Sequence, residues 1–300
     1  MIPNDSYELL DFGKGRKLER LGGVLLDRTS PPAETFTMTE PHSLWKQADG
    51  TFWRNDGLKG KWSWRCRLPE PWILKTNHFD LELKPTEVDH LGIFPEQSPN
   101  WEWIYAKTKD FLTCRPAFRV LNLFAYTGGS TLAAAAAMND AGKTARDNDS
   151  FFTVHVDSAK NIVQWARNNA MISALENAPI RWIAEDALKF VQREIKRGRK
   201  YDAIILDPPT YGHGTKGEVW KMERHLPELL DGCARLIEDS PAFVLLTAHS
   251  PGMDARKLGK ILEYHFPGKG TCETYSMSIK TQTGRILPSG EAARMIWGLS

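Results

Sequence analysis

The sequence has few cysteines, little net charge and no long apolar run, and each shortage excludes a class of protein. Its four cysteines (Cys66, Cys114, Cys233 and Cys272) lie far apart, without a CxxC pair or a histidine cluster at zinc spacing. This spacing argues against a structural zinc site and against a disulfide framework, and it favours a reducing, cytoplasmic setting. We therefore expect no bound metal.

The charge balance gives no sign of a polyanionic partner. The formal net charge is +2 over 300 residues, so nucleic acid or a membrane surface would have to be met by a local patch. The first residues lack an apolar signal core, and the low-charge run 120–139 is rich in Gly, Thr and Asn. We expect neither a signal peptide nor a transmembrane helix.

The pattern of apolar and turn-forming residues changes about a third of the way along the chain. From residue 6 to about residue 109, short apolar stretches are broken by Gly, Pro, Asn and Asp, and most of the eleven tryptophans lie here. These signals predict a mainly β accessory region over residues 1–110. After Pro116, strand and helix patterns alternate, and two strand-like pieces without a helix between them end the chain. Residues 111–300 are therefore predicted to form a Rossmann-like α/β domain with a mostly parallel sheet and one antiparallel edge strand.

Three consecutive predicted strands end in residues that suit a ligand. LFAYTGGST has a Gly128-Gly129 turn before a helix, HVDSAK ends in Asp157, and AEDALKF contains Asp186. Ligands of open α/β sheets bind at the carboxyl ends of the strands. The glycine turn suits an anionic group at a helix N-terminus, Asp157 suits ribose hydroxyls, and Asp186 suits an adenine amino group.

Each of these features also has a purely structural interpretation. The glycines can serve only the strand-to-helix turn, and Asp157 and Asp186 can serve as helix N-caps. The turn does not read GxGxxG, so the dinucleotide fingerprint is missing.

The fourth strand ends in the segment Asp207-Pro208-Pro209. Pro208 restricts Asp207 to an extended conformation, so its carboxylate is presented from a stiff loop. Two prolines can simply end a strand, but the acid before them and Tyr211 after them favour a site. Taken in order, the four strand ends suit a nucleoside with a charged amino-acid tail, which describes S-adenosylmethionine (SAM).

The stretch 119–250 resembles the class I SAM-dependent methyltransferases, and within them the bacterial group that modifies 23S ribosomal RNA. The similar pieces are VLNLFAYTGGSTLAAA, VHVDSAKNIVQWARNNA, IAEDALKF, YDAIILDPPTYG and FVLLTAHSP. The ending GRILPSGEAAR and the approach segment HLGIFPEQS are also similar, although Glu96 and Ser98 replace the Asp and Arg of the family. The family's RNA-binding module of PUA type is not evident, and the tryptophan-rich β region stands in its place.

The resemblance implies the role of each site residue. Asp207 and the Pro208 carbonyl would lie beside the methyl group and the target base. Tyr126 and Tyr211 could stack on the base or face the sulfonium charge, or could only pack. His249 could be a base, a substrate contact or a plain strand-end histidine. The residues implied to hold SAM, and its product S-adenosylhomocysteine (SAH), are Gln97, Phe124, Ala125, Tyr126, Thr127, Gly128, Asp157, Ser158, Asp186, Ala187 and Asp207.

The absence of a cysteine after the fifth strand indicates which atom of the substrate is methylated. Some members of the family methylate carbon 5 of cytosine through a cysteine that follows the fifth strand, and here His249 stands at that place. Carbon methylation needs a thiolate that adds to the ring, so a base nitrogen of RNA is the favoured target. The alternatives are a protein or small-molecule methyltransferase, and an RNA-binding protein with a vestigial SAM pocket.

The stretch 51–67, TFWRNDGLKGKWSWRCR, is the predicted contact with RNA. It carries five Lys or Arg residues against the single acid Asp56, with Trp53, Trp62 and Trp64 among them. Cations neutralise phosphates, and aromatic rings stack on unpaired bases. The alternative is a hairpin whose tryptophans pack inward, since period-two alternation separates Trp62 and Trp64 from Lys61 and Arg65.

Overall fold

The computed structural model describes residues 1–55, 59–147, 149–213, 219–238 and 242–298. The chain divides into two compact units. Unit 1 contains Met1–Pro99 and Met277–Ser289, and unit 2 contains Asn100–Ser276 and Gly290–Ser300. Unit 2 therefore holds all the strand ends that the sequence marks as a site.

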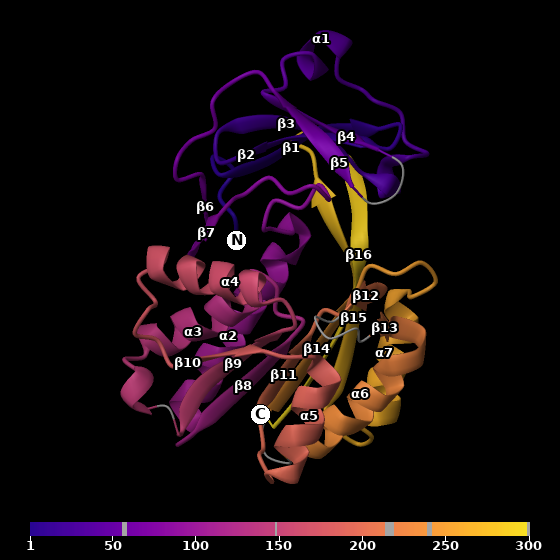
Figure 1. Cartoon of the computed structure of the whole chain (residues 1–300). Helices are drawn as coiled ribbons and strands as arrows, with labels where there is room; N and C mark the ends of the chain where they lie inside the picture. The colour runs from indigo at the N-terminus through magenta and orange to yellow at the C-terminus, as the bar shows by residue number, and fades with distance from the viewer. Residues whose placement is uncertain (56–58, 148, 214–218, 239–241, 299–300) are drawn as a thin grey trace. The chain divides into compact units, whose positions relative to one another are not determined.

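Unit 1 is built on a sheet of five strands in chain order (Figure 1). They are β1 (Tyr7–Gly13), β2 (Arg16–Leu21), β3 (Val24–Thr29), β4 (Gly50–Arg54) and β5 (Gly60–Trp64). Neighbouring strands are antiparallel except β3 and β4, which are parallel. Gly22 and Gly23 both have positive φ, the backbone that a two-residue turn between β2 and β3 requires.

The smaller elements of unit 1 complete it. They are the two-stranded sheet β6 (Ile73–Lys75) and β7 (Asp80–Glu82), with η1 (Pro31–Ala33), α1 (His42–Trp45) and η2 (Pro95–Gln97). Arg28, buried in β3, pairs with Glu19 at 2.5 Å and with Asp89 at 2.9 Å. Because a buried charge is tolerated only when it is paired, this cluster holds the loop at Asp89 against the sheet.

Unit 2 is organised around a seven-stranded sheet in the order β10-β9-β8-β11-β14-β16-β15. Strands β10, β9, β8, β11 and β14 are parallel, and β16 is antiparallel to β14. This arrangement confirms the predicted fold class, a mostly parallel Rossmann-like sheet with an antiparallel edge and an N-terminal β region. The strands are β8 (Phe118–Leu123), β9 (Phe151–Asp157), β10 (Ile180–Ala184), β11 (Ala203–Leu206), β14 (Ala242–Ala248), β15 (Thr271–Lys280) and β16 (Ile286–Trp297).

Helices cover both faces of this sheet (Figure 1). On one face α5 (Ala187–Lys196), α6 (Met222–Leu236) and α7 (Ala255–His265) share a core with Leu121 and Leu123 of β8. On the other face lie α2 (Ser98–Cys114), α3 (Gly129–Asp140) and α4 (Lys160–Ile172), with η3 (Ala145–Asp147) after α3. Because both faces are covered, the central strands are almost wholly buried and largely apolar.

Two elements differ from the sequence-based expectation. The first is α2, which forms where the β region was expected to continue. Its buried residues Trp101, Ile104, Thr108 and Phe111 recur at helical spacing, and Phe111 stacks on Phe118 of β8 at 5.0 Å between centroids. The second is the hairpin of β12 (Tyr211–His213) and β13 (Val219–Lys221) after β11.

The described helices include none that combines the length and the apolar character needed to cross a bilayer.

A buried polar network joins β8, β9 and α3. The Asn122 side-chain amide donates to Thr131 Oγ1 at 2.9 Å, and this hydroxyl lies 2.9 Å from His155 Nδ1. Burial, together with the charge of Arg167, lowers the pKa of His155 to about 3. The ring is therefore neutral near pH 7.

This buried histidine predicts a fold that weakens in mild acid. Its pKa is about 3 when folded and about 6.5 when unfolded, so only the unfolded state takes up the proton as pH falls below about 6.5. Between pH 7 and pH 5 this group alone removes roughly 2 kcal/mol of stability.

The test is a urea titration of wild type and His155→Gln at both pH values. The glutamine keeps a hydrogen-bonding side chain but takes up no proton. We expect the variant to lose about 2 kcal/mol less than wild type in the free energy of unfolding between pH 7 and pH 5. An equal loss in the two proteins would contradict the lowered pKa.

Candidate active site

The order of the strands creates the place for a site. Strands β8 and β11 are neighbours at the centre of the sheet, and the chain leaves β8 toward β9 and β10 before it returns to β11. At such a switch point the loops after the two strands diverge, which leaves a crevice at their carboxyl ends. The predicted site residues of unit 2 lie on these loops and on those of the adjacent strands.

The loop between β8 and α3 has an unusual backbone. Phe124 and Tyr126 have φ values of 56° and 49°, a region that bulky side chains rarely adopt. Such strain persists only where surrounding contacts hold it, and it clusters at functional sites. One of these contacts is the Ala125 amide, which donates to the carbonyl of Val156 at 3.0 Å. The strained loop is thus attached to the end of β9.

Glycine is required where this loop enters α3. Gly128 has a φ of 99° and is the N-cap of the helix. A Cβ atom at Gly129 would lie 2.7 Å from ring atoms of Trp101, which is too close for any side chain. Close packing against α2 therefore explains the second glycine, and the first provides the turn that exposes the helix N-terminus.

Asp157 ends β9 and is held by two backbone amides. Its Oδ2 accepts from the Tyr126 amide and its Oδ1 from the Ala159 amide, each at 3.0 Å. Burial raises the pKa of Asp157, although both amide bonds act in the opposite direction. The N-cap of α4 is Ala159 rather than Asp157. Since each carboxylate oxygen can accept two hydrogen bonds, Asp157 retains capacity for a ligand diol.

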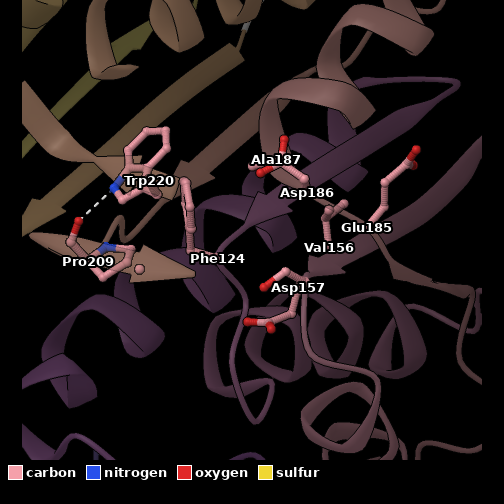
Figure 2. Close-up of a pocket in the computed structure, with 10 residues that line it drawn as sticks. Phe124, Val156, Asp157, Glu185, Asp186, Ala187, Pro209 and Trp220 are labelled. Carbon is pink, nitrogen blue, oxygen red and sulfur yellow. Dashed lines mark hydrogen bonds between the residues drawn. The ribbon is translucent and has the colours of Figure 1, made fainter. Parts of the chain in front are cut away.

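A pocket opens beside Asp157 (Figure 2). It contains about 410 Å³ of empty space, a volume that includes the solvent at its open mouth. Its wall combines carboxylates with apolar and aromatic side chains, as a nucleoside requires. The lining residues are Phe124, Val156, Asp157, Ser158, Glu185, Asp186, Ala187, Pro209, Gly212 and Trp220.

The end of β10 contributes two carboxylates to this wall. Asp186 is the N-cap of α5 and accepts from the Lys189 amide at 3.0 Å, so it caps a helix and also lines the pocket. Glu185 pairs with Arg193, and its amide donates to the Asp157 carbonyl at 3.0 Å. The backbone thus ties the two acidic strand ends together.

Asp207 follows β11 and is bound to the end of the neighbouring strand β14. Thr247 Oγ1 donates to Asp207 Oδ1 at 2.5 Å, and His249 Nε2 lies 3.5 Å from the same oxygen. The side chains of Asp207 and His249 are 32% and 35% exposed. The acid is therefore oriented from inside the sheet while it remains accessible to a substrate.

The segment after Asp207 passes from the interior to the surface. Pro208 is buried, whereas Pro209 and Tyr211 are exposed. Tyr211 begins β12, and Pro209 and Gly212 line the pocket. This segment therefore connects the carboxylate of Asp207 with the pocket wall.

The structure brings most of the predicted site residues together in unit 2. The pocket is lined by Phe124, Asp157, Ser158, Asp186 and Ala187. Ala125, Tyr126, Thr127 and Gly128 form the loop that is bound to the end of β9, and Asp207, Pro208, Tyr211 and His249 follow β11 and β14. Gln97 is buried at the end of η2 in unit 1. The chemical roles of these residues stay predictions.

Sequence reasoning missed Thr247, Glu185 and Trp220. Leu206 of β11 pairs with Leu246 of β14, so the residues that follow them, Asp207 and Thr247, are side by side. No local pattern reveals this register. Glu185 precedes the predicted Asp186 and could have been found by the same reasoning.

Among solved structures, a methyltransferase is similar to this chain over almost its whole length. The SAM-dependent methyltransferase of Agrobacterium tumefaciens is 34% identical, with a TM-score of 0.86 over 97% of this chain and 90% of that chain. A search of protein-family models found no match.

Curated relatives are similar over shorter stretches. Ribosomal RNA large subunit methyltransferase I of Aeromonas salmonicida is 25% identical over 218 residues, which are 72% of this chain and 50% of that protein. Ribosomal RNA large subunit methyltransferase K of Neisseria meningitidis is 27% identical over 120 residues, 40% of this chain and 31% of that protein. The chain thus spans only a third to a half of the length of these relatives.

Proposed function

Since the chain belongs to the SAM-dependent methyltransferases, we propose that it transfers a methyl group to a base nitrogen of RNA, and of ribosomal RNA in particular. The names of the curated relatives support an RNA substrate. The observation that carries the choice of a nitrogen is the pair of Asp207 and His249, 3.5 Å apart at the carboxyl ends of β11 and β14. An acid and an imidazole can accept hydrogen bonds from a base N–H.

The pocket fits the cofactor SAM by the chemistry of its wall. Asp157 would accept hydrogen bonds from the two ribose hydroxyls, and Asp186 would accept from the adenine amino group. Phe124 and Ala187 supply apolar surface for the base. The loop 124–128 and the N-terminus of α3 would receive the methionine end, where amide groups favour its carboxylate.

When bound, SAM supplies a methyl group on a sulfonium that needs no further activation. The protein therefore has mainly to align the acceptor, and alignment supplies up to roughly 7–11 kcal/mol of the barrier. Asp207 would accept a hydrogen bond from the attacking nitrogen, and Thr247 holds this carboxylate in place. His249 would share or remove the proton that the nitrogen loses.

The cysteines give independent support for a nitrogen acceptor. All four lie among the described residues. In unit 2, Cys233 is buried in α6 and burial raises its thiol pKa, as it does for Cys272 in β15. Cys114 and Cys66 are exposed, but Cys114 ends α2 and Cys66 follows β5, so neither lies on the segments that follow β11 and β14. A covalent route through carbon 5 of cytosine needs an accessible thiolate, and neither raised pKa favours one.

The test of this function is the methylated nucleoside itself. Ribosomal RNA from a strain that lacks the gene, treated with the purified protein and methyl-labelled SAM, is digested and analysed by mass spectrometry. We expect one labelled nucleoside methylated on a base nitrogen. Labelled 5-methylcytidine would contradict the nitrogen assignment, and label confined to protein or to small molecules would contradict the RNA substrate.

Asp157 and Asp207 are predicted to affect different steps. Asp157→Ala should weaken SAH binding at least tenfold, since a hydrogen bond to a charged group contributes about 1.5–3 kcal/mol. Asp207→Ala should lower kcat roughly 10²–10⁴-fold and leave SAH affinity within about threefold of wild type. Calorimetry with SAH and steady-state kinetics separate the two. Wild-type SAH affinity in Asp157→Ala would reject the ribose assignment.

For RNA binding, Trp53 is the best candidate within the stretch 51–67. Its side chain is 58% exposed, Lys61 stands opposite it on β5, and the Arg16 guanidinium lies 4.9 Å from its ring centroid. Arg16 is also paired with Asp27 at 2.6 Å. An exposed ring beside cations suits an unpaired base and its phosphate.

The other two tryptophans of this stretch follow the packing alternative. Trp62 and Trp64 stack on each other at 4.8 Å, and the indole of Trp62 donates to the Thr86 carbonyl at 3.0 Å. Trp64 also contacts Trp72 edge-on at 6.4 Å. Residues 56–58 of the predicted stretch lie outside the described residues.

Trp53→Ala is predicted to weaken the binding of single-stranded RNA by about 1–3 kcal/mol, the usual contribution of one base stacked on an aromatic ring. Trp53→Phe should retain most of the affinity. Fluorescence anisotropy with a labelled RNA fragment measures the effect. Tyr264→Ala, which removes another exposed aromatic from α7, is the control. If Trp53→Ala binds as tightly as this control, Trp53 is not the stacking residue.

A further inference from the structure

Trp220 links the wall of the pocket to the segment that carries Asp207. It is the middle residue of β13, is only 6% exposed, and lines the pocket. Two of its contacts lead to different parts of the site (Figure 2). One is made by its aromatic ring and the other by its indole N–H.

The ring of Trp220 packs on Phe124. The ring centroids are 4.8 Å apart with the planes inclined by 58°. Phe124 has a left-handed backbone at the end of β8, a conformation that only surrounding contacts maintain. The His225 ring lies 5.6 Å from Trp220 as well. These aromatic neighbours fix where the indole lies.

The indole N–H of Trp220 donates to the carbonyl of Pro209 at 2.7 Å, the bond drawn in Figure 2. Both prolines of the segment 207–209 have a fixed φ, and each restricts the residue before it to extended conformations. Few torsions remain between Asp207 and Pro209. A bond to the last carbonyl therefore sets the orientation of the whole segment, including the carbonyl of Pro208.

The opposite end of the segment is held separately. Thr247 binds the carboxylate of Asp207 at 2.5 Å, and beyond the prolines the Met222 amide donates to the Thr210 carbonyl at 3.1 Å. Of the three residues that donate these hydrogen bonds to the segment, Trp220 also lines the pocket. Movement of the wall and movement of the Asp207 segment are thereby coupled.

We propose that Trp220 is a positioning residue: its hydrogen bond to Pro209 holds Asp207 and the Pro208 carbonyl in the geometry needed for methyl transfer. This inference rests on the proposed function for its kinetic consequence. It does not depend on which nucleotide is methylated.

The kinetic test compares Trp220→Phe with Trp182→Phe. Phenylalanine at position 220 keeps an aromatic wall but removes the N–H donor, and Trp182 is a partly buried tryptophan of β10 outside the proposed site. We expect kcat to fall at least tenfold in Trp220→Phe while SAH affinity and the KM for SAM stay within about threefold of wild type. Trp182→Phe should keep the wild-type kcat. Unchanged kcat in Trp220→Phe, or equal losses of kcat and SAH affinity, would overturn the positioning role.

Hydrogen exchange tests the same bond without a methyl acceptor. In Trp220→Phe, the backbone amides of residues 210–213 should exchange at least tenfold faster than in Trp182→Phe, while those of α3 should not change. Equal exchange rates in the two variants would overturn the inference. Inactivity of wild type toward every RNA would instead reject the proposed function, and the exchange result would still decide whether Trp220 holds the segment.

Discussion

The carboxylate of Asp157 makes the pocket possible because it joins the two loops that form it. One oxygen accepts the amide of Tyr126 after β8, and the other accepts the amide of Ala159 before α4. A largely buried carboxylate is costly unless such bonds compensate it, and here the bonds also maintain the strained backbone at residues 124–126. The same interaction that satisfies a buried charge thus shapes the cleft at the switch point of the sheet.

Two groups of strands contribute different residues to the site. The ends of β8, β9 and β10 supply the carboxylates and apolar surface of the pocket, and the ends of β11 and β14 supply Asp207, Thr247 and His249. Because β8 and β11 are adjacent, the proposed cofactor on one group would lie beside the acid on the other. The short segment of two prolines and the hairpin after it keep the groups together, since both contribute to the pocket wall.

Residue patterns within short stretches of the sequence located the strands and the acidic residues that follow them. Buried parallel strands are continuous apolar runs, so β8, β9, β11 and β14 could be located, and the acids that follow them mark the sheet edge. The helix α2 escaped detection because its apolar positions lie within a stretch rich in tryptophan and broken by prolines. The sequence also could not decide that Trp62 packs against Trp64 while Trp53 is exposed. Alternation assigns residues to two faces of a strand but does not say which face is buried.

The sequence by itself determined the fold class, the strand ends that carry Asp157, Asp186 and Asp207, and the nature of a ligand that such residues suit. Only the tertiary structure decided the contacts between distant segments: Thr247 with Asp207 through the register of β11 and β14, and Trp220 with Pro209 across the hairpin. Periodicity and propensity act over a few neighbouring residues. Register and packing depend on residues that are remote in sequence, and no local pattern encodes them.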